Sequence, residues 1–369
     1  MAEDWVVGDL VLPGTFIRVR AEGLIGLAGI SSGNIGIVGV GAVQPPFDQA
    51  ETQLLSTAAE AQAVFGPAVV DSAAKALNFT AMINELFRGG ARTVYARGLG
   101  ASPADKDYDA AFAEIVKEDV QILVAPGLAT AKALTLFQGI LNVADAAQQD
   151  LMAVVGMDGK IDDIVKAGPA NGRVVLVTPG YSVIDPTPPA AGESAPAGPG
   201  WVDLPGSYSA GPVAALIASL PPQVSPTNKA LPIGRLARRY SYAERTTLVK
   251  GRVLALEERN GVRVVRGITT DPGPFAQITT RRIVDYAKSG IRQVSNPFIG
   301  RLNNARVRAA LQSAIDGLLT SMLVDEQLTA YKLEVTATRR DEIEGRAIVN
   351  ALLQPTFSID YVAVTIVLQ

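Results

Sequence analysis

The end of the chain constrains the fold most strongly, because its pattern predicts three successive β-strands. Residues 331–338 alternate between apolar and polar side chains, which is typical of a half-buried strand. The run 343–353 alternates less regularly, and Pro355 interrupts it before a last strand over 357–368. From Val362 onward this last strand is apolar on both faces, so both faces need cover. It is therefore either the middle strand of its own sheet or a strand lent to a neighbour's sheet.

Composition excludes several kinds of chemistry. The 369 residues include no cysteine and no histidine. Disulfides, thiolate nucleophiles and histidine-dependent catalytic sites are therefore excluded, and the commonest metal ligand is missing. No apolar run reaches the roughly 18 residues of a membrane helix, and the N-terminus lacks the basic start of a signal peptide. We expect no metal, no cofactor and no stable membrane insertion, and a chain that begins in a cytoplasm.

Charge is unevenly distributed along the chain. Residues 235–312 contain 16 Lys and Arg against 5 Asp and Glu, although the whole chain has a net charge of −3. Such a basic segment favours an acidic partner. The segment lacks the interleaved aromatic residues of a nucleic-acid stacking surface, so an acidic protein surface suits it at least as well as nucleic acid.

Apolar strands and helices alternate through the first half of the chain. Four apolar strands within residues 93–178, separated by helices, predict an α/β sheet that is mostly parallel. Residues 185–205 are rich in Pro, Gly, Ala and Ser and predict a long surface loop. Two helices are expected over 280–294 and 302–323. The expected division of the chain is an N-terminal arm (1–32), an α/β region (33–232), a C-terminal domain (233–355) and a C-terminal β arm (356–369).

No catalytic motif is complete. The glycines within 36–41 follow an apolar strand as in a dinucleotide site, but Pro45 and Pro46 stand where a helix N-terminus would hold the pyrophosphate. The serines within 207–211 lack the glycine of a nucleophile elbow and a histidine to serve them. A glycine-rich buried strand and a turn leading into a helix are the better interpretations.

Several short segments, taken in order, resemble the contractile tail sheath family, which includes phage tail sheaths and the sheaths of pyocins and other injection machines. Each segment alone is a common turn or strand, and their shared order carries the resemblance. The segments are Pro13-Gly14-Thr15-Phe16-Ile17, the strand 36–41, Phe65-Gly66-Pro67, the helix end and strand 87–97, the strand and turn 120–127, the turns 204–211 and 225–229, and the helix start 279–283. The chain departs from the family at 265–270, where members often carry a tryptophan.

The resemblance implies a fold and a function. The fold would be an α/β core related to subtilisin-like domains but without catalytic residues, followed by an α+β C-terminal domain, with extended N- and C-terminal strand arms. The protein would be a structural subunit and not an enzyme. It would polymerise as helical stacked six-fold rings around an inner tube and contract to drive the tube through a cell envelope. Its partners would be copies of itself, the inner tube protein, and baseplate and tail terminator proteins, in a virion tail assembled in the host bacterial cytoplasm.

Two groups of residues are expected to make the contacts of such an assembly. The arms would lend strands to neighbouring subunits through Phe16, Ile17, Val19, Phe357, Ile359, Tyr361, Val362, Val364, Ile366 and Leu368. Part of the basic face would meet an acidic tube through Arg281, Arg282, Lys288, Arg292, Arg301, Arg306 and Arg308. The alternative for these basic residues is a solvated surface or pairing with acids elsewhere in the chain. The rival functions are a histidine-free doubly wound α/β enzyme and a nucleic-acid-binding module that uses residues 235–312.

Overall fold

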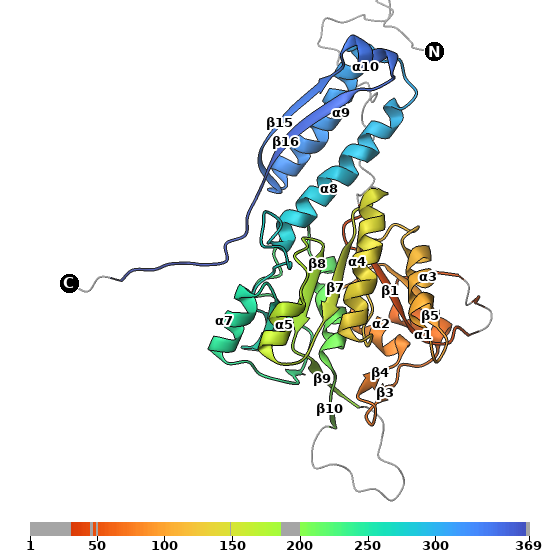
Figure 1. Ribbon diagram of the computed structural model, residues 1–369, viewed down its shortest axis with the longest axis vertical. Coiled ribbons are helices and arrows are strands. Elements are labelled where there is room, and N and C mark those ends of the chain that lie inside the picture. The colour runs from red at the N-terminus through yellow and green to blue at the C-terminus, as the bar shows by residue number, and fades with distance from the viewer. Residues whose placement is uncertain (1–30, 45–46, 49–50, 148, 186–199, 367–369) are drawn as a thin grey trace, which may run out of the picture.

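A computed structural model of the chain describes residues 31–366 except for 45–46, 49–50, 148 and 186–199. The predicted arm residues Phe16, Ile17, Val19 and Leu368 lie outside the described residues, as does most of the predicted loop 185–205. The described residues form an α/β body and an elongated C-terminal unit that projects from it (Figure 1). None of the described helices combines the length and the apolarity that a membrane span requires.

The body is built on a nine-stranded sheet whose six central strands are parallel. The strand order is β11-β14-β13-β8-β7-β6-β1-β5-β2, and only the outer strands β2, β14 and β11 pair antiparallel. Because β1 lies between β5 and β6, the chain extends the sheet in both directions from β1, as a doubly wound fold does. The predicted mostly parallel α/β sheet is confirmed. The strands are β1 (Ile35–Val40), β2 (Gln53–Leu55), β5 (Val94–Leu99), β6 (Ile122–Val124), β7 (Met152–Gly156), β8 (Val174–Thr178), β11 (Ala230–Leu231), β13 (Leu254–Glu258) and β14 (Val262–Val264).

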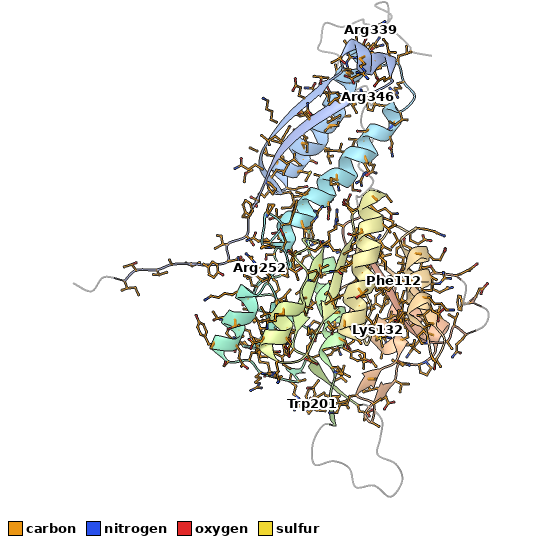
Figure 2. The ribbon with its side chains drawn as sticks, viewed as in Figure 1. Phe112, Lys132, Trp201, Arg252, Arg339 and Arg346 are labelled. Atoms are coloured by element: carbon orange, nitrogen blue, oxygen red, sulfur yellow. The ribbon has the colours of Figure 1, made fainter. Side chains whose placement is uncertain are left out.

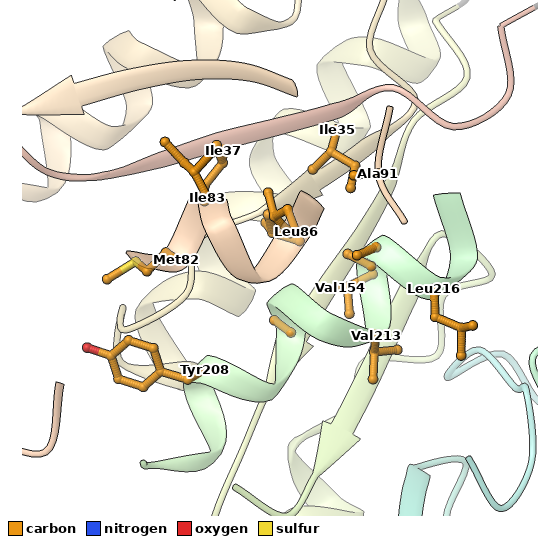
Figure 3. Close-up of a cluster of buried hydrophobic side chains, with 14 of the residues drawn as sticks. Ile35, Ile37, Met82, Ile83, Leu86, Ala91, Val154, Tyr208, Val213 and Leu216 are labelled. Carbon is orange, nitrogen blue, oxygen red and sulfur yellow. The ribbon is translucent and has the colours of Figure 1, made fainter. Parts of the chain in front are cut away.

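Helices cover both faces of this sheet because its strands are apolar on both faces. Ile35 and Ile37 of β1 belong to one hydrophobic core, and Val38 belongs to the core on the opposite side. Figure 3 shows the first core, where side chains of β1, α2 and α6 meet. Its helices are α1 (Ala58–Phe65), α2 (Phe79–Arg88) and α6 (Ala210–Ser219). The second core is covered by α3 (Asp105–Ile115), α4 (Thr130–Ala146), α5 (Ile161–Ala167) and α7 (Tyr242–Lys250).

Close packing of helices accounts for the glycines of β1. A Cβ on Gly36 would lie 2.6 Å from the Ile115 side chain, and a Cβ on Gly39 would lie 2.6 Å from the ring of Phe79. Any larger residue would therefore push α3 or α2 away from the strand.

Short strands complete the body. β9 (Tyr181–Ile184) lies between β10 (Trp201–Asp203) and β12 (Arg235–Leu236), and β3 (Val70–Asp71) pairs with β4 (Ala76–Leu77). A 3-10 turn over Gly206–Ser209 leads into α6. The predicted boundary between residues 232 and 233 falls inside the body, because β13 and β14 follow it in the chain and join the large sheet.

The C-terminal unit packs two long helices against a β-hairpin around a third hydrophobic core. Its elements are α8 (Ile278–Ser295), a 3-10 turn (Asn296–Phe298), α9 (Ala305–Val324), β15 (Leu328–Thr336), α10 (Arg339–Ile343) and β16 (Ile348–Pro355). The two predicted helices are confirmed as α8 and α9. The charged stretch between the hairpin strands forms the short helix α10, because Thr338 and Asp341 cap each other's backbone N–H groups.

The predicted strand over 357–368 differs from the structure. Residues 356–366 continue from β16 as an extended segment, but they pair with no strand among the described residues (Figure 1). Among the described residues, this segment is thus not the middle strand of a sheet. The apolar pattern predicts the extended backbone, while strand pairing also requires a partner edge.

Candidate functional site

The candidate site is the segment 356–366, which we call the C-terminal arm, together with the surface that holds its base. Its apolar side chains face solvent along its whole described length, and from Tyr361 to Ile366 every residue is exposed. Ile359 is 81% exposed and Tyr361 is 75% exposed. A soluble subunit rarely leaves so many large apolar side chains uncovered in one stretch unless another molecule covers them.

The base of the arm is held by hydrogen bonds. The backbone N–H of Thr356 donates to the Gln327 carbonyl at 3.0 Å, and the backbone N–H of Ser358 donates to Gln277 Oε1 at 3.4 Å. The side chains of Ser358 and Asp360 turn toward the body while those of Phe357, Ile359 and Tyr361 turn outward. Residues 356–360 are thus an ordered stem, and residues 361–366 extend beyond it.

Asp360 makes the last contacts of the stem with the body. Its Oδ2 accepts hydrogen bonds from Arg266 Nε at 2.8 Å and from Gln277 Nε2 at 3.2 Å. Its Oδ1 accepts one from Thr227 Oγ1 at 3.3 Å. The Arg266 guanidinium also lies 5.4 Å from the ring centre of Tyr361. These groups form the arm side of a groove of about 560 Å³ between α7 and the β13–β14 hairpin.

The β15–β16 hairpin offers unpaired strand edges. It is a two-stranded sheet in which neither strand has a second partner among the described residues. Leu352 of β16 is 73% exposed and lies on the same face of the strand as Asn350 and Gln354. Two strands alone make a marginal sheet, so edges of this kind are sites for added strands.

Two of the predicted tube-facing residues are buried at the joint between α8 and the body. The Arg281 guanidinium packs over the Phe275 ring at 4.4 Å and donates from Nε to Asp285 at 3.0 Å. Arg282 donates to the carbonyl oxygens of Leu220 at 2.8 Å, Ser32 at 3.0 Å and Pro221 at 3.3 Å. Burial lowers the pKa of Arg282 to about 10. Neither side chain is available to an outside surface.

Two more of these residues pair with Asp150, next to β7. Lys288 Nζ lies 2.6 Å from Asp150 Oδ1 and Arg292 Nη1 lies 2.8 Å from Asp150 Oδ2. Burial opposes ionisation of Asp150, but the bonds from Lys288 and Arg292 outweigh it and hold the pKa of Asp150 below its ordinary value. Arg173 completes the cluster, with contacts of 3.2 Å to Asp150 and to Asp285 of α8. The cluster therefore ties the C-terminal unit to the body.

The remaining three basic residues lie at the far end of the C-terminal unit, where Figure 2 places Arg339 and Arg346. Arg308 pairs with Glu342 at 3.0 Å. Arg301 and Arg306 are exposed and form no ion pair with any described residue. For five of the seven basic residues, pairing or burial inside the chain thus accounts for the charge, and the tube-facing prediction stays open for Arg301 and Arg306.

The polar side chains that hold the arm were not predicted from the sequence. Asp360 is the only acid in the apolar run 357–368, and that isolation is the signal that could have marked it. Thr227, Arg266 and Gln277 carry no such signal, because only the fold brings these distant positions together. In the described part of the chain, no group of three or more acidic side chains is placed to hold a metal ion.

Comparison with known proteins identifies the C-terminal part. The family model of the phage tail sheath C-terminal domain matches residues 270–369. The matched residues comprise the projecting unit and the arm, and they begin just before α8. Among curated proteins, no sequence matches the chain.

Solved structures extend the likeness to the whole fold. The contracted helical sheath of the anti-feeding prophage has 16% identity and a TM-score of 0.74, over 96% of this chain and 99% of that one. The contracted PVC sheath of an extracellular contractile injection system has 15% identity and a TM-score of 0.73, over 96% and 97%. A sheath tail protein of Listeria innocua has 11% identity and a TM-score of 0.68, over 89% and 93%. The resemblance to contractile tail sheath proteins is confirmed, and at these identities it concerns the fold.

Proposed function

We propose that this protein is a structural subunit of a contractile tail sheath. It would polymerise as helical stacked rings around an inner tube and contract to drive the tube through a cell envelope. The observation that carries the proposal is the exposed apolar C-terminal arm on a fold similar, over 96% of the chain, to a contracted sheath subunit. A head-to-tail contact of this kind does not close, and it therefore generates a helical array.

The arm joins subunits by lending a strand. Its described apolar residues are Phe357, Ile359, Tyr361, Val362, Val364 and Ile366, and the hairpin β15–β16 of a neighbour is the candidate receiver. A lent strand forms about four to six backbone hydrogen bonds, each contributing roughly 0.5–1.5 kcal/mol net. Burial of the apolar side chains adds to this sum. The N-terminal arm, with Phe16, Ile17 and Val19, would form a second link of the same kind with a neighbouring subunit.

Strand links of this kind suit a machine that changes shape. They persist while the bodies rotate, because backbone hydrogen bonds at the end of a flexible arm do not depend on the angle between bodies. Contraction is then release from a kinetically held state, with the driving energy in new contacts between the bodies. Arg301 and Arg306, which form no ion pair with a described residue, would meet an acidic tube through weak contacts that can break.

The setting follows from this role. The subunit would belong to the sheath of a virion tail or a related injector, assemble in the bacterial cytoplasm with six-fold rings, and contact the inner tube, the baseplate and the tail terminator. The α/β body would be a non-catalytic relative of subtilisin-like domains. The enzyme alternative gains no support, because no catalytic motif in the sequence is complete and the pKa shifts of Asp150, Asp285 and Tyr181 arise from burial and ion pairing.

Removal of the arm tests the proposal. Deletion of residues 361–369 removes the exposed part of the arm and leaves the stem, the body and the hairpin in place. We expect a soluble subunit with the unfolding midpoint of the parent that forms no tubes in negative-stain micrographs, under conditions where the parent does. Tubes of normal length from the truncated protein would contradict the role of the arm.

A further inference from the structure

We infer that Asp360 is a positioning residue, which fixes where the C-terminal arm leaves the subunit and which way its faces point. The inference deepens the proposed function and rests on it, because the orientation of the arm matters only if the arm joins a second copy. Its first support is a contrast in burial. The Asp360 side chain is 5% exposed, whereas both neighbours in the chain, Ile359 and Tyr361, are among the most exposed apolar residues described.

The chemistry of the contact is that of a built site. A buried carboxylate is costly unless donors surround it, and here both oxygens are occupied. The three donors come from separate parts of the fold: Thr227 from the turn before β11, Arg266 from the segment after β14, and Gln277 from the N-cap of α8. Thr227 Oγ1 also accepts from the Gly267 N–H at 2.9 Å, whereas Arg266 Nε and Gln277 Nε2 donate to the arm.

The contact also fixes the rotation of the arm about its axis. Successive side chains of an extended chain point to opposite sides, so burial of Ser358 and Asp360 turns Ile359 and Tyr361 outward. The Arg266 guanidinium holds the Asp360 carboxylate and also lies against the Tyr361 ring, which limits rotation at the point where the free part begins. A slip of one residue would exchange the two faces of Val362 to Ile366. Asp360 thus sets the register in which those residues are offered to a neighbour.

Loss of the Asp360 contact would weaken assembly, because more residues of the arm would have to be ordered when a neighbour is bound. With Asp360 in place, only the residues beyond it must be ordered when a neighbour is bound. Without it, the stem must be ordered in the same step, and each residue that becomes fixed opposes binding through lost backbone entropy. The free subunit should be hardly less stable, because the apolar side chains of the stem, Phe357 and Ile359, are exposed and add little to any core.

Spin labelling tests the contact in the free subunit. The chain has no cysteine, so Ile359→Cys supplies a single labelling site on the outward face of the stem. We expect an immobilised label at residue 359, and a mobile one after Asp360→Ala or after Arg266→Ala, which opens the contact from the other side. Glu114→Ala is the matched control, since it removes an exposed acid that pairs with Lys117 on the body, and it should leave the label immobilised.

Polymerisation tests the consequence. Without the label, we expect Asp360→Ala and Arg266→Ala each to raise the critical concentration for tube formation at least tenfold, and the double variant to be no worse than either. Glu114→Ala should match the parent. A label that is equally mobile in all proteins, or a critical concentration unchanged by a mobilised stem, would overturn the inference. If the parent forms no tubes while its label is immobilised by Asp360, the proposed sheath function fails and the contact itself stands.

Discussion

Replacement of Arg282 by methionine should destabilise the free subunit, because the Arg282 guanidinium holds three separate segments together. It donates to the carbonyl oxygens of Leu220 and Pro221, after α6, and of Ser32, before β1, while its own backbone lies in the first half of α8. Methionine fills a similar volume but offers no donor. The carbonyl oxygens of Leu220 and Ser32 would then lose this partner inside the joint between the body and the C-terminal unit, whereas the carbonyl oxygen of Pro221 would still accept from the Val224 N–H at 3.0 Å.

The magnitude follows from two opposing terms. An orphaned buried acceptor costs about 1–3 kcal/mol, so two of them cost about 4 kcal/mol at the middle of that range. Removal of a buried charge returns part of this, and the burial that lowers the pKa of Arg282 to about 10 corresponds to about 3 kcal/mol. The balance is a loss of about 1 kcal/mol of unfolding free energy.

Urea unfolding at a concentration below that of polymerisation measures the change, and hydrogen exchange of α8 locates it. Arg306→Met is the matched control: Arg306 lies on α9, is exposed and has no described ion-pair partner, so its replacement should change the unfolding free energy by less than about 0.5 kcal/mol. Equal stability of Arg282→Met and the parent would refute the reasoning and return Arg282 to the set of residues available to an outside partner.

Three further predictions address the arms, the tip and the ion cluster. Ile17→Pro removes a backbone donor and restricts the backbone conformation of Phe16 before it. It should therefore block tube formation in micrographs and barely change the melting temperature of the free subunit. A large loss of monomer stability would instead place this segment inside its own subunit. Arg301→Glu combined with Arg306→Glu should still give sheath-like polymers but fewer that enclose a tube, and raised salt should mimic the effect; double variants that enclose tubes as often as the parent at every salt concentration would remove the tip from the tube contact. Because the pKa of Asp150 is lowered in the folded protein, its contribution to stability is present above its unfolded pKa and is lost as pH falls through the folded pKa. Between pH 5 and about pH 2 the urea midpoint should therefore fall less for Asp150→Asn than for the parent. Parallel curves for the two proteins would show that other groups cause the acid sensitivity.

The sequence predicts well the features that repeat along it. Patterns of apolar residues predict the parallel sheet, the helices α8 and α9 and the strands β15 and β16, because they record which sides of each element are buried, but they do not predict that β15 and β16 pair as a hairpin. The extended backbone of residues 357–366 follows from the same reasoning. The lack of a partner strand among the described residues does not follow from this reasoning, because a strand lent to a neighbour and a strand within its own sheet have the same pattern of apolar residues.

Features that depend on distant contacts were not predictable in this way. The run of basic residues from Arg281 to Arg308 predicts a charged face, yet the fold brings Asp150 to Lys288 and Arg292, Asp285 to Arg281, and Glu342 to Arg308. The side chains of Arg281 and Arg282 lie under neighbouring segments, where helical periodicity alone does not place them. The number of charged residues in a segment therefore does not give the charge that the folded segment exposes on the surface.

The positions of these ion pairs bear on how a sheath subunit could transmit force. Ion pairs join the body to α8: Arg173, before β8, contacts Asp285 of α8, and Asp150, before β7, contacts Lys288 of α8. Arg173 also contacts Asp150 within the body. Arg282 adds hydrogen bonds to segments before β1 and after α6. Partly buried pairs are screened less than exposed ones, so the joint should hold its angle at ionic strengths that weaken surface contacts. The arm, in contrast, is fixed to the body only as far as Asp360 and exposes apolar residues beyond it. A subunit built in this way can rotate as one body, with its projecting unit held at a constant angle, while the links to its neighbours bend at the residues that follow Asp360.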